Sequence, residues 1–176
     1  MQVRLIRTTD GQLYAMKSLS KRQIAEKNQL RDVLAERHIM LLIKHPFTVQ
    51  LRYSFQNEWK LYFVMDYYCG GSLYSQLLRC VKFSEDTAKF YAAELLSALG
   101  HLHDNGIAYR DLKLENILID DRGHIALTDF GLSKYDIDKT GGATTFCGTA
   151  EYIAPEMLEG RKYGKTVDWW SFGILL

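Results

Sequence analysis

The sequence predicts an α+β protein in which a small antiparallel sheet with one main helix precedes a mostly helical region. Residues 1–66 contain paired apolar runs around turn residues, which is typical of antiparallel strands. After the double glycine at 70–71, apolar residues recur instead at helical spacing. This break indicates a hinge between a smaller first part of the chain and a larger second part.

The composition is that of a folded chain without an excess of charge. Of the 176 residues, 47% are hydrophobic and 24% are charged. Lys and Arg number 22 against 21 Asp and Glu, so the net charge is +1. This balance argues against a nucleic-acid partner or an anionic membrane surface. No apolar run reaches the length of a membrane span, and we therefore expect no membrane insertion.

The cysteines favour an intracellular protein. Cys69, Cys80 and Cys147 are odd in number and lack the paired spacing of a zinc site, which indicates free thiols in a reducing compartment. We expect a cytoplasmic location, with the nucleus as the second option.

Two hairpins account for the first part of the chain. Residues 3–6 and 13–17 are apolar runs on either side of a Thr-Asp-Gly-Gln turn, and Asp-Gly is a strong hairpin signal. Residues 49–55 alternate between apolar and polar side chains, and residues 61–65 are continuously apolar. The sequence therefore predicts two antiparallel strand pairs.

A helix is predicted between the two hairpins and is expected to pack on the sheet. It is indicated by apolar residues that recur at helical spacing: Leu30, Val33, Leu34 and Leu41. Glu36 and Met40 lie one turn apart on a neighbouring stripe.

A longer helix is predicted to begin after Ser84. This residue is a good N-cap, and the two acidic residues after it suit the positive end of a helix. One face of the helix is apolar and carries Ala88, Tyr91, Ala92, Leu95, Leu99 and Leu102. The helix is expected to end before Gly106, where His101 and His103 suit its negative end. A metal site at these histidines is disfavoured, because no third ligand is spaced nearby.

A third hairpin is predicted from residues 117–119 and 124–127, with a long loop after it. Residues 129–152 show no strand or helix pattern and contain four threonines. A loop of this length usually has a function.

Four polar residues flank the third hairpin. Asp111, Lys113 and Asn116 precede it, and Asp129 follows it. Because a tight hairpin brings its flanks together, we expect these side chains to converge. Asn116 and Asp129 could bind a hard metal ion through oxygen, while Asp111 would face an incoming hydroxyl. Lys113 would neutralise charge on a transferred phosphoryl group. Each residue alone has a plainer interpretation, since Asp and Asn in turns commonly bond the backbone.

The spacing of these residues resembles that of eukaryotic protein kinases. The motifs that carry the resemblance extend over nearly the whole chain: Tyr14–Lys17, Tyr109–Asn116, Asp129–Gly131, Ala154–Glu156 and Asp168–Gly173. Lys113, two residues after the candidate base, is the form found in serine/threonine kinases. Tyr109 and the stretch 145–149 resemble the AGC group. Within that group, Leu114, His124 and the Trp169-Trp170 pair are most similar to the protein kinase B and serum/glucocorticoid-regulated kinase branches.

The resemblance implies a two-lobed fold with an ATP site between the lobes. Residues 1–66 would form the small lobe, 67–71 the hinge and 72–176 the large lobe. Lys17 would contact the ATP phosphates and pair with Glu36. The other implied nucleotide contacts are Val3, Ala15, Met65, Asp66, Tyr68, Glu115, Leu118 and Thr128. Magnesium would be held by Asn116 and Asp129, and a stacked apolar column would consist of Met40, Leu51, Tyr109 and Phe130.

The resemblance also implies regulation through the long loop. Thr145 matches an activation-loop phosphorylation site, and Arg110 and Lys134 match the basic residues that receive the phosphate. Thr149 would bind the catalytic base and Lys113 near the substrate, and Glu115 would attract a substrate arginine. The implied partners are protein substrates that carry Ser or Thr and an upstream activating kinase.

The sequence departs from the family pattern at several points. The Gly-rich loop that covers the phosphates is absent, and the chain stops inside what resembles the central helix of the large lobe, so we expect a domain incomplete at both ends. We therefore expect these 176 residues alone to fold marginally and to turn over ATP slowly or not at all. Asp32 stands where many AGC kinases have a phosphate-binding histidine, which weakens the expected coupling of loop and helix. Ser72 stands where relatives often carry a glutamate that binds substrate arginine.

Phosphoryl transfer from ATP to protein Ser or Thr is therefore the favoured function, with magnesium as cofactor. The alternative is a catalytically incompetent kinase-like fragment that acts as a docking or scaffold module. A small-molecule phosphotransferase is disfavoured by the Ala154–Glu156 motif and by the phosphorylatable loop, which such enzymes do not need.

Overall fold

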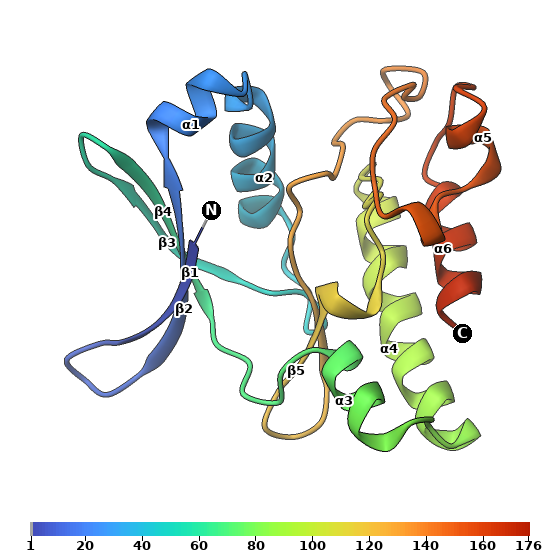
Figure 1. Cartoon of the computed structure of the whole chain (residues 1–176), viewed down its shortest axis with the longest axis horizontal. Helices are drawn as coiled ribbons and strands as arrows, with labels where there is room; N and C mark the ends of the chain where they lie inside the picture. Colours follow the sequence, from blue (N-terminus) through green and yellow to red (C-terminus); the bar gives the residue numbers. More distant parts are fainter. Residues whose placement is uncertain (1) are drawn as a thin grey trace.

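A four-stranded antiparallel sheet forms the smaller of two lobes in the computed structural model, which describes residues 2–176 (Figure 1). Its strands are β1 (Gln2–Arg7), β2 (Leu13–Ser20), β3 (Leu51–Gln56) and β4 (Lys60–Asp66), in the spatial order β1-β2-β4-β3. Both predicted strand pairs are present, and β2 continues three residues beyond the predicted end.

The first hairpin turns where the sequence predicts it. The Thr8 N–H donates to the Gln12 carbonyl at 2.9 Å, and Gly11 has a φ of +86°, a conformation that favours glycine. In the register of the sheet, Ala15 pairs with Met65 and lies two residues from Lys17. Since alternate residues of a strand point to the same face, this places Ala15 and Lys17 on one side of β2, as expected.

Two helices accompany the sheet. The sequence prediction missed the first, α1 (Lys21–Glu26), whose N-cap is Ser20. The second, α2 (Leu30–Leu42), is the predicted helix, but the prediction of its buried face is wrong. The predicted stripe is largely exposed, at 55% for Leu30, 55% for Leu34 and 48% for Leu41. The neighbouring stripe is buried instead, with Glu36, Ile39 and Met40, and Val33 is the buried residue of the predicted stripe.

The larger lobe is mostly helical, as predicted (Figure 1). Its elements are α3 (Leu73–Cys80), α4 (Glu85–Asp104), the 3-10 turn η1 (Leu114–Asn116), the hairpin strands β5 (Ile117–Ile119) and β6 (Ile125–Leu127), the turn η2 (Ala150–Tyr152), α5 (Pro155–Leu158) and α6 (Val167–Leu175). The Ser84 hydroxyl caps α4 as predicted, since it accepts a hydrogen bond from the Thr87 N–H. Leu95, Leu99 and Leu102 of the predicted face are buried.

The segment between α2 and β3 fastens the small lobe to the large one. The Val49 N–H donates to the Leu127 carbonyl, and the Leu127 N–H donates to the Phe47 carbonyl, both at 2.9 Å. One apolar core extends across this junction, from Met40 in α2 to the residues packed around α4. The α+β two-lobed class predicted from the sequence is therefore confirmed. Within residues 2–176, no helix combines the length and the apolar character that crossing a bilayer requires.

Candidate active site

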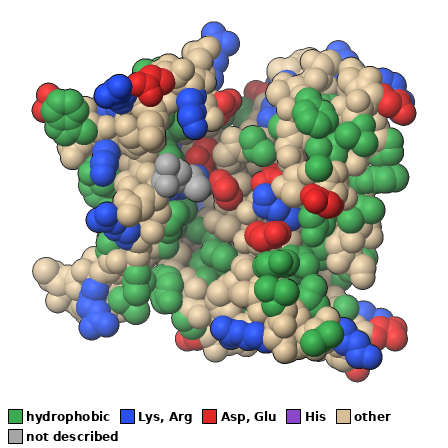
Figure 2. Space-filling model, viewed as in Figure 1, with side chains coloured by type: hydrophobic (Ala, Val, Ile, Leu, Met, Phe, Trp, Pro, Cys, Tyr) green, Lys and Arg blue, Asp and Glu red, His purple; other side chains and the backbone are tan. Residues whose placement is uncertain are grey.

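A cavity of about 390 Å³ lies between the lobes and collects charged residues from both. Lys17 comes from β2 and Glu36 from α2, while Asp111 and Asp129 come from the loops that flank the β5–β6 hairpin. Figure 2 shows the hollow between the lobes, where acidic and basic side chains gather. The predicted convergence of Asp111 and Asp129 is therefore present in the structure.

Lys17 is the bridge between the two lobes in this cavity. Its Nζ lies 2.5 Å from Glu36 Oε1 and 3.2 Å from Asp129 Oδ1. Burial opposes the charged form of Lys17, but Glu36 and Asp129 outweigh it and raise the pKa of the ammonium. Burial raises the pKa of Glu36, and Lys17 offsets only part of that shift. The shift of Lys17 thus follows from two carboxylates that share one ammonium, whereas the shift of Glu36 follows from burial.

This shared arrangement leaves an excess of negative charge, which suits a magnesium ion. Asp129 is the more exposed of the two carboxylates that contact Lys17, with 41% of its side chain accessible. The Asn116 amide nitrogen donates to the Asp111 carboxylate at 2.9 Å, so the Asn116 oxygen is the atom that remains for a metal. Magnesium is typically bound through one or two protein oxygens together with substrate phosphates. The donors present therefore fit magnesium beside a phosphate.

Asp111 is the centre of a second set of polar contacts. Its Oδ1 accepts a hydrogen bond from the Thr149 hydroxyl at 2.8 Å, and its Oδ2 lies 3.2 Å from Lys113 Nζ. Lys113 also donates to the Thr149 hydroxyl at 2.8 Å. The structure thus brings Asp111, Lys113, Asn116 and Thr149 together as the sequence predicts. Thr149 belongs to the long loop, so this contact fixes the end of the loop against Asp111.

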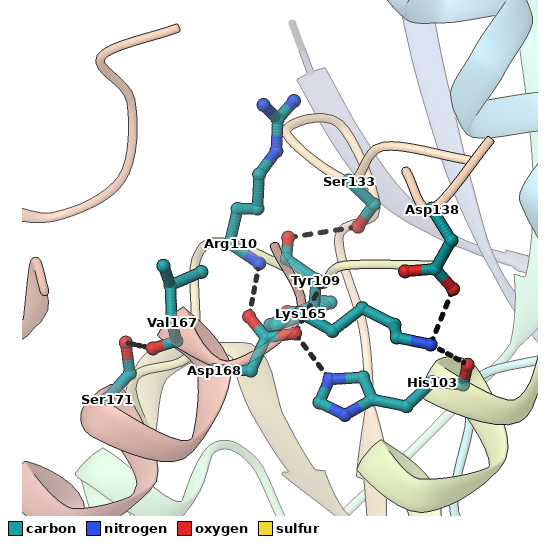
Figure 3. Close-up of polar contacts among 9 residues, drawn as sticks. All are labelled: His103, Tyr109, Arg110, Ser133, Asp138, Lys165, Val167, Asp168 and Ser171. Atoms are coloured by element: carbon teal, nitrogen blue, oxygen red, sulfur yellow. Dashed lines mark hydrogen bonds and ion pairs between the residues drawn. The ribbon is translucent and has the colours of Figure 1, made fainter. Parts of the chain in front are cut away.

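Asp168 binds the backbone directly before Asp111 (Figure 3). This residue lies in α6 and is completely buried. Its Oδ2 accepts hydrogen bonds from the Tyr109 N–H and from His103 Nε2, and its Oδ1 accepts one from the Arg110 N–H, all at 2.8 Å. Arg110 has a φ of +70°, a strained conformation that these contacts stabilise. Its side chain extends away from the Asp168 carboxylate (Figure 3).

Aromatic packing supports the same backbone. The rings of Tyr109 and Phe130 meet edge to face with centroids 5.7 Å apart, and both rings are almost completely buried. The Tyr109 hydroxyl donates to the Thr128 carbonyl. Burial and the carboxylates nearby raise the pKa of Tyr109 well above its usual value, so the hydroxyl stays a donor. Met40 and Leu51 belong to the same apolar core.

Of the predicted nucleotide contacts, only Lys17 lines the cavity between the lobes. Glu115 lies in η1 and Thr128 directly follows β6, while the others lie on the small-lobe sheet, in the segment after β4 and in β5. Val3 is opposite Lys17 in the register of β1 and β2, and Met65 is opposite Ala15. Leu118 lies in β5, close to the hinge, because Ser72 forms an isolated bridge with it. At the end of β4, both carboxylate oxygens of Asp66 bind Arg52 of β3 at 2.7 Å. Burial raises the pKa of Tyr68 to about 12.

Of the predicted regulatory residues, Thr145 and Lys134 lie in the long loop, and Arg110 contacts it. Thr145 is exposed. Arg110 Nε donates to the Leu132 carbonyl at 2.6 Å, and Lys134 Nζ donates to the Gly142 carbonyl at 3.3 Å. The two basic side chains therefore contact the loop backbone, and neither has a hydrogen bond to the Thr145 side chain among residues 2–176.

The sequence prediction missed three residues that support the site. His103 binds Asp168, whereas the sequence suggested only a helix-end role for it. Glu94 lies on the buried face of α4 and accepts the Ile125 N–H at 2.9 Å. An acidic residue inside an apolar helical stripe is a signal that could have found it. Tyr163 contacts both Arg110 and the long loop, and no local pattern marks it.

Residues 2–176 contain no cluster of three His, Cys, Asp or Glu that could hold a metal at His101 and His103.

Known proteins align with this chain over almost its whole length. Residues 2–176 match the protein kinase domain. The RAC family serine/threonine-protein kinase homolog of Dictyostelium discoideum is 55% identical over 170 residues, which cover 94% of this chain and 38% of that protein. Serine/threonine-protein kinase sgk-1 of Caenorhabditis elegans is 53% identical over 165 residues, 93% of this chain and 36% of that protein. Human ribosomal protein S6 kinase alpha-2 is 51% identical over 175 residues, 99% of this chain and 24% of that protein. The chain thus spans about two fifths or less of the length of these relatives.

Proposed function

The chain belongs to the protein kinase domain family, and we propose that it transfers the γ-phosphoryl group of ATP to Ser and Thr hydroxyls of proteins. The observation that carries the proposal is the shared cavity: Asp111 and Asp129 line it together with the buried Lys17–Glu36 pair. Its relatives are named serine/threonine-protein kinases, which supports the same acceptor class.

Lys17 and Asp129 account for binding of the triphosphate. The Lys17 ammonium is held in one orientation by Glu36 and would contact the α- and β-phosphates. Asn116 and Asp129 would hold magnesium. When bound, that ion neutralises negative charge on the phosphates. Because the Lys17 ammonium contacts Asp129 at 3.2 Å, the two groups are already held side by side in one site.

Asp111 would orient the acceptor hydroxyl and take up its proton. One of its carboxylate oxygens already binds a hydroxyl, that of Thr149, with the geometry that an acceptor would need. Lys113 Nζ lies within 3.2 Å of Asp111 and would stabilise charge on the transferred group. Most of the rate acceleration would come from this positioning and charge neutralisation, since phosphoryl transfer needs little covalent help from the protein.

The biological setting belongs to the same proposal. We place the protein in the cytoplasm, with the nucleus as the second location, and assign it protein substrates and an upstream kinase that phosphorylates Thr145. The three free cysteines and the exposure of Thr145 support this setting.

Peptide phosphorylation by the purified chain tests the function. The assay supplies γ-labelled ATP, magnesium and a serine peptide with an arginine two residues upstream, the residue that Glu115 would attract. We expect slow transfer by the wild type and loss of transfer in Asp111→Asn, with nucleotide binding retained. Asp121→Asn, an exposed carboxylate in the β5–β6 turn, is the matched control and should transfer normally. Equal turnover in Asp111→Asn and Asp121→Asn would refute the proposed role of Asp111. If the wild type transfers no labelled phosphate from ATP to the peptide, the function is refuted.

A further inference from the structure

Tyr163 is buried at the point where the long loop meets the catalytic segment. It lies between α5 and α6 and is only 4% exposed. Its backbone pairs with Ala143 of the loop, through hydrogen bonds of 2.8 and 2.9 Å in the two directions. This pairing therefore fixes the Tyr163 backbone, and with it the Cα from which the side chain extends, beside the loop.

The Tyr163 hydroxyl contacts two segments that are far apart in the sequence. It donates to the Thr145 carbonyl at 2.6 Å and accepts a hydrogen bond from Arg110 Nη1 at 3.0 Å. The Cys147 sulfur lies 3.8 Å from the same hydroxyl. A phenylalanine ring would fill the same space, but it could make neither hydrogen bond.

Arg110 connects this hydroxyl to the metal segment as well. Its Nε donates to the Leu132 carbonyl, one residue beyond the Asp129–Gly131 motif. Its backbone N–H binds Asp168, and the next residue is Asp111. One guanidinium group thus contacts both the segment that carries Asp129 and, through Tyr163, the loop at Thr145.

The loop between Thr145 and Thr149 is consequently held at both ends. Tyr163 holds the Thr145 carbonyl, and Asp111 and Lys113 hold the Thr149 hydroxyl. Between them, Gly148 passes so close to the catalytic segment that a Cβ atom there would lie 2.8 Å from the Arg110 carbonyl. The segment therefore has little freedom as long as both ends remain attached.

We propose that Tyr163 is a positioning residue that holds the Thr145–Thr149 segment on the catalytic segment before Thr145 is modified. The hydroxyl fixes the Thr145 carbonyl and aims the Arg110 guanidinium toward the loop. Arg110 is then already in place when a phosphate arrives on Thr145. Burial raises the pKa of Tyr163, although Arg110 opposes the shift, so the hydroxyl remains a donor at neutral pH.

Amide hydrogen exchange of the unphosphorylated chain tests the inference without any need for catalysis. In Tyr163→Phe, we expect exchange at residues 143–149, which include the Ala143 N–H bonded to the Tyr163 carbonyl, to rise about 3- to 10-fold, the effect of losing about one hydrogen bond. Exchange in α4 should not change. Tyr91→Phe is the control, because it removes a tyrosine hydroxyl from a half-buried side chain on α4, where Tyr91 packs against Phe83. This control should leave exchange at residues 143–149 unchanged.

A kinetic measurement separates positioning from general stability, and this second readout rests on the proposed function. We expect Tyr163→Phe to raise the KM for peptide about 3- to 10-fold while the KM for ATP stays the same. Unchanged exchange at residues 143–149 in Tyr163→Phe would overturn the inference. Increased exchange throughout α4 as well would also overturn it, because the hydroxyl would then stabilise the whole lobe. If the wild type transfers no phosphate, the proposed function fails, while the exchange comparison still decides the role of Tyr163.

Discussion

The Asp168 carboxylate accepts the backbone N–H of Arg110 at 2.8 Å, which fixes the residue directly before Asp111. The same carboxylate accepts the Tyr109 N–H and binds His103. A side chain from α6 thus determines the path of a loop that lies more than fifty residues earlier in the sequence. The position of Asp111 consequently depends on the large lobe as a whole.

Replacing Asp168 by asparagine should destabilise the protein by about 3 kcal/mol. Asparagine has one acceptor oxygen where aspartate has two, so one of the N–H groups that Asp168 binds would be left buried and unpaired. Urea unfolding measures the loss, with Asp121→Asn as the exposed control. A difference below about 0.5 kcal/mol between the two variants would show that the Asp168 contacts contribute little.

The Lys17–Glu36 pair allows stability and activity to be separated. Lys17→Met should destabilise the protein by about 3 kcal/mol, because it leaves the buried Glu36 carboxylate without its closest partner. Adding Glu36→Leu should restore most of that stability, since an apolar pair tolerates burial. Phosphoryl transfer should stay lost in both variants. Transfer by the double variant at the wild-type rate would rule out the proposed phosphate contact of Lys17.

Gly148→Ala should detach the loop from the catalytic segment. Alanine at a φ of +104° costs about 1 kcal/mol, and its Cβ would meet the Arg110 carbonyl. Gly123→Ala is the matched control, because Gly123 has a φ of +88° and an added Cβ there meets no atom within 4 Å. We expect both variants to lose stability in urea, and only Gly148→Ala to lose peptide phosphorylation. Equal activity in the two would show that the close approach has no catalytic importance.

The His124–Glu94 contact should make stability depend on pH. The Glu94 carboxylate, 2.5 Å from His124 Nδ1, raises the pKa of His124 above its usual value of 6.5 through a hydrogen bond and through its charge. The folded state thus holds the proton more tightly than the unfolded state. The contribution is complete below about pH 6.5 and is lost as the pH rises through the folded-state pKa. Urea midpoints of the wild type and His124→Asn should therefore converge between about pH 6 and pH 8.5. A constant offset between the wild type and His124→Asn over this pH range would contradict the prediction.

Local patterns were sufficient to predict the strands and the long helix. Alternation and the Asp-Gly turn predict the first hairpin, and the Ser84 cap with an apolar face predicts α4. The face of α2 was not predictable in the same way. Its leucines follow helical spacing, but Glu36 is buried through its contact with Lys17, which lies 19 residues away in the chain. Periodicity contains no information about such a partner.

The residues of the site likewise include some that the local sequence predicts and some that it does not. Asp111, Lys113, Asn116 and Asp129 lie on the two flanks of one hairpin, so their convergence could be inferred from the sequence. His103 and Tyr163 contribute through contacts that span 65 and 53 residues. Neither has a local signature, because a histidine at a helix end and a tyrosine after a glycine-containing turn are both common. Only the tertiary structure shows that these two residues support the catalytic segment.

The two chain crossings between the lobes restrict how the molecule can open. One crossing is the hinge at residues 67–71, and the other is the segment in which Phe47 and Val49 are hydrogen-bonded to Leu127 of β6. Sliding one lobe past the other would break the second attachment, whereas swinging about the line through both crossings preserves it. Lys17 would then travel along an arc toward or away from Asp129, while Phe47 remains nearly stationary at the pivot.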